Sequence, residues 1–77
     1  MAYNNSRNPL RALQQSIGGT IEIRLKDGLI YKGTLKEYDA FMNIIITQAT
    51  EFVNREPGAT FDELLVRGNN ILFIVPQ

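Results

Sequence analysis

The chain has 77 residues, a formal net charge of zero, and neither cysteine nor histidine. A chain of this length forms one domain at most and buries only about 60% of the surface that its unfolded form exposes. Domains this small are usually reinforced by disulfides, a metal or contacts between subunits. The composition excludes disulfides and disfavours a metal, so it favours association between subunits.

The two halves of the sequence carry opposite charge. Residues 1–36 contain six basic and two acidic residues, and residues 37–77 contain two basic and six acidic residues, giving net charges of +4 and −4. This asymmetry fits either solvated faces of one molecule or complementary edges of identical subunits.

No segment has the pattern of a membrane anchor or an export signal. The apolar runs are far shorter than the roughly 20 residues of a transmembrane helix, and residues 1–8 lack the apolar segment of a signal peptide. We therefore expect a cytoplasmic protein without a membrane partner.

A short helix is predicted near the amino terminus. The pair Asn8-Pro9 favours a helix start, because Asn caps free amides and Pro is preorganised for the first helical position. Gly18-Gly19 then ends the helix with residues that accept left-handed dihedral angles. Between them, apolar side chains recur at helical spacing, at Leu10, Leu13 and Ile17. Residues 1–8 are expected to form a flexible tail before a single domain of residues 9–77.

Alternating polarity predicts two strands next, Thr20–Lys26 and Leu29–Tyr38. The intervening Asp27-Gly28 indicates a two-residue hairpin turn. Gly33 lies inside the second strand, where a glycine suggests a sharp bend or a close backbone approach, as in a sheet that curls into a barrel. The alternative is a glycine that is merely tolerated there.

Three further strands are expected, and they are Met42–Thr47, Phe61–Arg67 and Ile71–Val75. Glu51–Arg55 can continue the sheet, Pro57-Gly58 is predicted as a turn, and Gly68–Asn70 as another. The last strand is apolar throughout and is closed by Pro76. An open edge of this kind would template aggregation unless a neighbouring subunit paired with it. Head-to-tail pairing that closes on itself gives a ring.

Catalysis is not expected. The chain has no His or Cys nucleophile or base, no glycine-rich phosphate loop after a strand, and no carboxylate cluster with ligand spacing. The available acids, Asp39 and Asp62-Glu63, are best explained by turn formation or solvation. We predict a protein that is not an enzyme and has neither a cofactor nor a metal.

Two predicted turns hold the candidate binding residues. The first contains Asp39, Phe41 and Asn43, and the second contains Arg67, Gly68 and Asn69. Each residue alone has a structural explanation: a turn former, a core aromatic or an ion-pair partner. Together, an aromatic ring, an amide, a carboxylate and a guanidinium at strand ends suit a flat, hydrogen-bonding base. The combination predicts RNA binding.

These motifs resemble the Sm and Sm-like proteins, most closely the archaeal members, over Pro9 to Pro76. The first motif corresponds to Ile21–Ile46, and the second to Leu65–Ile74. In the first motif the matching positions are Gly33, Leu35, Tyr38, Asp39, Met42 and Asn43. The resemblance implies a mainly β fold, with an N-terminal α-helix on a strongly bent, five-stranded antiparallel barrel. It also implies rings of about six or seven subunits that bind U-rich single-stranded RNA.

The resemblance also implies a role for each residue. Phe41 would stack on the base, Arg67 would cover its other face, and Asn43 would read its edge. Asp39 would orient Asn43, and the backbone of Gly68 and Asn69 would close the pocket. There are two departures: Asn69 stands where relatives often have Asp, and Glu37 stands where Gly is frequent. The second motif also lacks the Tyr-Lys-His signature of bacterial Hfq.

We therefore expect a homo-oligomeric ring, heptameric or alternatively hexameric, that acts as an RNA scaffold or chaperone in RNA processing, with RNA-processing proteins as further partners. The alternative is a structural ring whose partners are proteins and whose RNA pocket is vestigial. The complete set of Phe41, Asn43 and Arg67 favours RNA, whereas the zero net charge favours the alternative.

Overall fold

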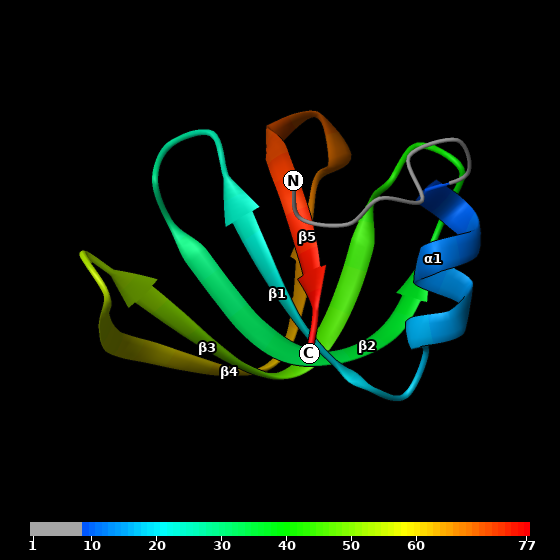
Figure 1. The fold of residues 1–77 in the computed structure, drawn as a ribbon. Helices are drawn as coiled ribbons and strands as arrows, with labels where there is room; N and C mark the ends of the chain where they lie inside the picture. Colours follow the sequence, from blue (N-terminus) through cyan, green and yellow to red (C-terminus); the bar gives the residue numbers. More distant parts are fainter. Residues whose placement is uncertain (1–8) are drawn as a thin grey trace.

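A computed structural model describes residues 9–77 of the chain, in which one helix precedes five strands (Figure 1). The elements are α1 (Pro9–Ser16), β1 (Thr20–Leu25), β2 (Ile30–Tyr38), β3 (Ile44–Val53), β4 (Glu56–Val66), the single 3₁₀ turn η1 (Gly68–Asn70) and β5 (Ile71–Pro76). The predicted helix and five strands are confirmed. The predicted tail, residues 1–8, and the capping Asn8 lie outside the described residues.

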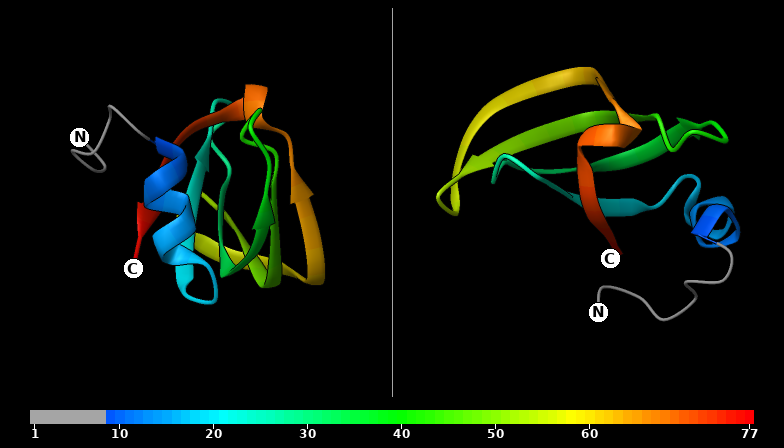
Figure 2. Two further views of the ribbon diagram at one scale, coloured as in Figure 1. Left: turned by 90° about the vertical axis from the view of Figure 1, so that its right-hand side faces the viewer. Right: turned by 90° about the horizontal axis from the view of Figure 1, so that it is seen from above.

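The strands form one antiparallel sheet in the order β4-β3-β2-β1-β5. The sheet is strongly bent, and α1 lies to one side of it (Figures 1 and 2). This arrangement confirms the expected mainly β fold with an N-terminal helix. Within residues 9–77, β4 and β5 each pair with a single strand, so both edges of the sheet are open.

Alternate side chains of the strands form the core. Ile21, Ile23 and Leu25 of β1 are buried, as the period of two requires. Leu13 brings α1 against the same cluster. The other buried hydrophobic residues are Leu35, Ile44, Ile46, Ala49, Val66 and Ile74. The intervening positions of the strands face away from this core and can carry polar side chains.

Gly33 marks the bend of the sheet. A Cβ atom there would lie 2.8 Å from the carbonyl oxygen of Thr47 and 3.2 Å from the Cα atom of Ala49. Opposite it, β3 carries a bulge, since Lys32 pairs with Thr50 while Thr34 pairs with Thr47. Bulges bend a strand and increase its twist. The predicted close backbone approach at this glycine is confirmed.

The first hairpin loop is one residue longer than predicted. The backbone N–H of Leu25 donates to Leu29 O (2.9 Å), and that of Gly28 donates to Leu25 O (3.1 Å), so Lys26, Asp27 and Gly28 form a three-residue loop. Gly28 has a φ of 94°. A turn followed by a left-handed glycine is a common three-residue connection. Asp27 stabilises it by accepting a hydrogen bond from the N–H of Leu29 (3.0 Å).

The predicted turn at Pro57-Gly58 is wrong. Strand β3 continues to Val53, and the chain reverses at Asn54-Arg55, both of which have positive φ. Pro57 lies inside β4, paired with Phe52. Proline can occupy this position because β4 is an edge strand, where one side of the backbone has no ladder partner.

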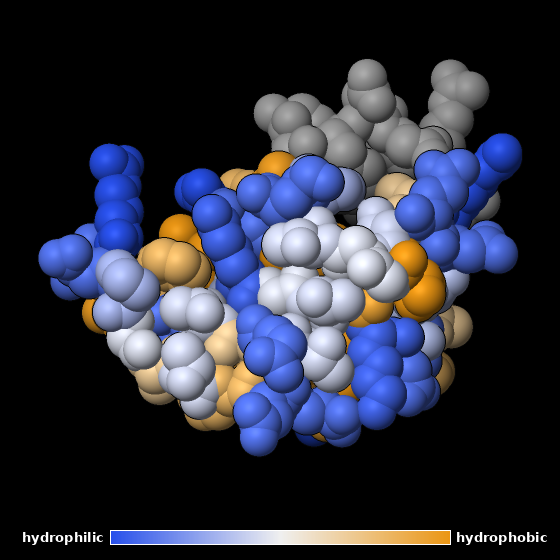
Figure 3. Space-filling model, turned by 90° about the horizontal axis from the view of Figure 1, so that it is seen from below, coloured by the Kyte–Doolittle hydropathy of each residue, from blue (hydrophilic) through white to orange (hydrophobic). Residues whose placement is uncertain are grey.

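The side of the molecule seen from below carries hydrophilic residues interspersed with neutral and hydrophobic ones (Figure 3). The large hydrophobic side chains that are exposed are Ile17, Phe41, Val53, Leu65 and Leu72. Of these, Leu65 and Leu72 lie on the two edge strands. No helix within residues 9–77 is long and apolar enough to cross a membrane.

Candidate nucleic-acid interface

The Asp39 carboxylate organises the turn between β2 and β3. Its Oδ1 atom accepts hydrogen bonds from the backbone N–H groups of Phe41 (2.8 Å) and Asn43 (3.0 Å). The backbone N–H of Asp39 donates to Asn43 O (3.1 Å), which closes the turn. Met42 has a φ of 65°, so it belongs to the turn and not to the third strand, where it was predicted.

These contacts favour the charged form of Asp39. The side-chain hydrogen bond from Asn43 is the main cause of a pKa below the usual value for a carboxyl group. The backbone donors of Asn43 and Phe41 and the charge of Arg67 act in the same direction, and desolvation opposes them. Asp39 is therefore an ionised acceptor at neutral pH.

The Asn43 amide joins the two turns. Its Nδ2 atom donates to Oδ2 of Asp39 (3.0 Å), and its Oδ1 atom accepts from the backbone N–H of Gly68 (2.8 Å). A rotated amide would face Asp39 with an acceptor and Gly68 with a donor group, so both bonds select one orientation. One amide hydrogen and one lone pair of Oδ1 remain for a ligand. The predicted orienting contact of Asp39 with Asn43 is present.

Gly68 makes this junction sterically feasible. A Cβ atom at this position would clash with the carbonyl oxygen of Phe41 and would lie 2.9 Å from the carbonyl carbon of Met42. A larger residue would therefore separate the two turns. Gly68 opens η1, in which the N–H of Asn70 donates to Arg67 O (3.1 Å). The predicted turn at Gly68–Asn70 is thus a single turn of 3₁₀ helix.

The two turns border an open hollow of about 550 Å³. The residues that line it are Phe41, Met42, Asn43, Arg67, Gly68 and Asn69. Five of the six predicted site residues therefore lie together, and Asp39 supports them without lining the hollow. Met42 is the lining residue that sequence reasoning missed; its place between Phe41 and Asn43 is the signal that could have found it.

The side chains at this hollow are available for contact. Phe41 is 81% exposed, so the alternative of a core aromatic is wrong for this position. Arg67 and Asn69 are also exposed. The hollow thus combines a free aromatic face, a guanidinium and an oriented amide, which are groups that can stack on and hydrogen-bond to a flat polar ring.

Residues 11–76 match the LSM domain. The chain belongs to the LSM domain family. It is 34% identical over 71 residues to the U6 snRNA-associated Sm-like protein LSm6 of Aspergillus clavatus, covering 92% of this chain and 91% of the relative. The LSM assignment confirms the resemblance inferred from the two motifs.

Solved structures of LSM relatives share the fold. The Pyrococcus abyssii Sm protein, in complex with a uridine heptamer, has a TM-score of 0.88 and 28% identity, covering 90% of this chain and 97% of that chain. A heptameric archaeal Sm protein has a TM-score of 0.81 and 31% identity, covering 87% and 97%. This LSM domain is therefore similar both to archaeal Sm proteins and to LSm6.

Proposed function

We propose that this protein binds U-rich single-stranded RNA in the hollow between its two turns and acts as an RNA scaffold or chaperone in RNA processing, without enzymatic activity. The proposal rests chiefly on the Asn43 amide, which Asp39 and Gly68 hold in one orientation. The uridine heptamer bound to the Pyrococcus abyssii Sm protein supports it.

Stacking would supply sequence-tolerant affinity. The exposed Phe41 ring offers a face for a base, and the Arg67 guanidinium lines the same hollow. Stacking of a base on an aromatic side chain contributes roughly 1 to 3 kcal/mol, and a guanidinium adds a stacking or cation–π contribution. Every base has such a face, so these two residues would not discriminate between pyrimidines.

The preference for uracil would come from Asn43. Uracil presents an N3 donor beside a carbonyl acceptor, whereas cytosine presents an N3 acceptor beside an amino donor. An amide free to rotate would satisfy either edge. The bonds from Asp39 and Gly68 hold the amide in one orientation, so the free lone pair of Oδ1 would face N3 and favour uracil.

Subunits would assemble head to tail through β4 and β5. Both edges are open, and each carries an exposed leucine: Leu65 at 57% and Leu72 at 60%. Pairing one edge with the other edge of a neighbour closes into a ring. We propose a homo-oligomeric ring, a heptamer in the first instance and a hexamer as the alternative; the heptameric archaeal relative supports the former.

Fluorescence anisotropy with oligo(U) and oligo(C) tests the pocket. Phe41→Ala should weaken binding of both oligomers alike, by about 1 to 3 kcal/mol per occupied site. Asn43→Ala should instead reduce the preference for U over C. Gln14→Ala, an exposed residue on α1, is the matched control for loss of an amide and should change neither.

Two results would contradict the proposal. If Asn43→Ala retained the full preference for uracil, the amide would not be the discriminating group. If wild-type protein bound neither oligomer, the vestigial-pocket alternative would replace RNA binding as the function.

A further inference from the structure

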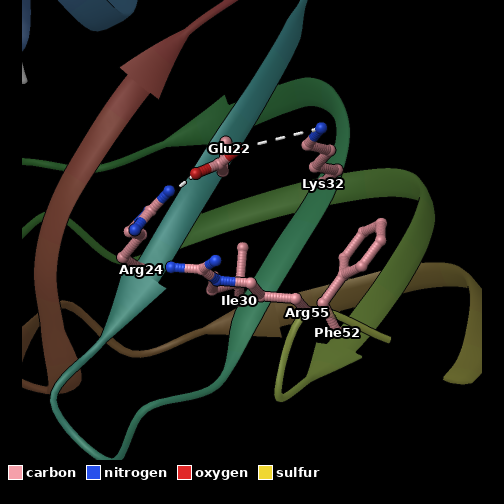
Figure 4. Close-up of a pocket in the computed structure, with 6 residues that line it drawn as sticks. All are labelled: Glu22, Arg24, Ile30, Lys32, Phe52 and Arg55. Atoms are coloured by element: carbon pink, nitrogen blue, oxygen red, sulfur yellow. Dashed lines mark hydrogen bonds and ion pairs between the residues drawn. The ribbon is translucent and has the colours of Figure 1, made fainter. Parts of the chain in front are cut away.

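A second hollow lies at the other end of the β2–β3 hairpin. It has a volume of about 290 Å³ and is lined by Glu22, Arg24, Ile30, Lys32, Phe52 and Arg55 (Figure 4). Strand β2 begins at Ile30, beside the second hollow, and ends at Tyr38, next to the Asp39 turn. The length of β2 therefore separates the two hollows, and they share no lining residue.

Strand register assembles this second hollow. Arg24 pairs with Ile30, which pairs with Phe52, so these three residues form a row across β1, β2 and β3. Glu22 and Lys32 form part of the next row. On β1, these residues alternate with the buried isoleucines of the core. The hollow thus lies on the face of the strands that points away from the core.

The second hollow is positively charged in a chain without net charge. Glu22 is the single acid among its lining residues, and its side chain is 12% exposed. Its carboxylate accepts a hydrogen bond from Arg24 Nε (2.7 Å) and lies 3.8 Å from Lys32 Nζ. Lys32 also lies 5.6 Å from the centre of the Phe52 ring. The hollow is therefore lined by three cations, Arg24, Lys32 and Arg55, and by one carboxylate, which leaves a local charge of +2.

Arg55 has an unusual backbone conformation for a residue with a side chain. It occupies the second central position of the Asn54-Arg55 turn with a φ of 68°, where glycine is the preferred residue because a side chain is strained. Its guanidinium has no hydrogen bond or ion pair with another residue of the described range 9–77. In Figure 4 its side chain extends from the turn across Ile30. The strained position thus brings to the hollow a cation that has no ion pair within residues 9–77.

We propose that this hollow is a second RNA-contact site, which binds phosphates of a single strand through Arg55, Arg24 and Lys32 and packs a base or ribose against Ile30 and Phe52. This inference rests on the proposed RNA-binding function and extends it. An RNA strand that is longer than the segment bound in the first hollow would contact both sites of a subunit.

The mixture of groups favours RNA over an acidic protein segment. Sites for single-stranded nucleic acid combine a positive surface that follows the phosphates with aromatic rings that accept bases. Here the aromatic Phe52 lies within the cationic cluster and not beside it. The contacts are to phosphate and to a ring face, so this site would add affinity without a preference between uracil and cytosine.

Arg55→Gly tests the inference, with Asn54→Gly as the matched control in the same turn. Glycine suits both positions, so each variant should fold and melt at or above the wild-type temperature. Only Arg55→Gly should weaken long oligo(U) and long oligo(C), by roughly three- to tenfold and equally. The slope of log affinity against log salt concentration should fall by about 0.7 for each phosphate that the variant no longer neutralises. Arg55→Lys, which retains the charge, should recover most of that slope.

The probes separate this inference from the proposed function. If short oligo(U) binds but Arg55→Gly matches Asn54→Gly on long RNA, the second site is overturned and the first stands. If short oligo(U) fails to bind but long RNA binding depends on Arg55, the second site stands alone. Equal competition by polyglutamate of matched charge would overturn the RNA assignment of the hollow. Absence of binding to any RNA at low salt would overturn both sites.

Discussion

One carboxylate supports the whole first turn. Asp39 accepts two backbone N–H bonds and one side-chain N–H bond, so its two oxygens position both Phe41 and Asn43. It does this without lining the hollow itself. Asp39 is thus a positioning residue, and its substitution should alter binding through the orientation of its neighbours.

The pH dependence of binding tests this role. The pKa of Asp39 is lowered in the folded protein, chiefly by the Asn43 side chain. The contribution of Asp39 to the stability of the folded protein should therefore be complete above its unfolded pKa of about 3.9. This contribution should disappear as the pH falls through the lower pKa of the folded protein. Asp39→Asn should weaken oligo(U) binding at neutral pH and flatten the acid limb of a titration followed by anisotropy. The exposed Asp62→Asn is the control, and an unchanged acid limb in Asp39→Asn would contradict the role.

At the residue scale, the sequence predicted which residues share a turn better than it predicted the contacts between the two turns. The motif placed Asp39, Phe41 and Asn43 in one turn because they are close in the chain. The bond from Gly68 N–H to Asn43 joins residues 25 positions apart. That contact depends on how β3 and β4 pair, which local patterning does not determine, and the left-handed Met42 was likewise hidden by its apolar side chain.

At the scale of elements, the bend of β2 depends on a close backbone approach that a side chain would prevent. Gly33→Ala should place a Cβ atom against Thr47 O and lower the free energy of unfolding by about 1 to 3 kcal/mol. Gly58→Ala, also within a strand, meets no atom closer than 3.6 Å and should be neutral or slightly stabilising. Urea denaturation of both variants decides the matter; equal stabilities would show that the bend does not depend on Gly33.

The sequence correctly predicted that the five strands exist, but it predicted the turns between them only in part. Asp27-Gly28 correctly indicated a hairpin, but the loop includes Lys26 and places only the glycine in a left-handed conformation. Pro57-Gly58 carried a stronger turn signal than Asn54-Arg55, yet the chain reverses at the latter. Tertiary pairing of β4 with β3 overrode local turn preference there.

At the scale of the whole molecule, edge pairing predicts the assembly. Leu72→Lys should lower the particle mass measured by light scattering, because a charge on the open β5 edge opposes burial against a neighbour. Val53→Lys, an equally simple change at an exposed position of interior strand β3, should leave the mass unchanged. Ile74 is unsuitable for this test because it is 2% exposed, and a charge there would unfold the subunit. A wild-type monomer at micromolar concentration would contradict the ring.

The strand order β4-β3-β2-β1-β5 would fix the spacing between neighbouring hollows in a ring. The two open edges belong to consecutive strands, joined by the segment that carries Arg67 and Gly68. In a ring built through these edges, each hollow proposed to bind a base would lie at a fixed distance from the junction with the neighbouring subunit. Adjacent hollows would then repeat at the period of the subunits, and the backbone, not the side chains, would set that period. Such a ring would contact RNA at regular intervals, and each interval would correspond to one subunit.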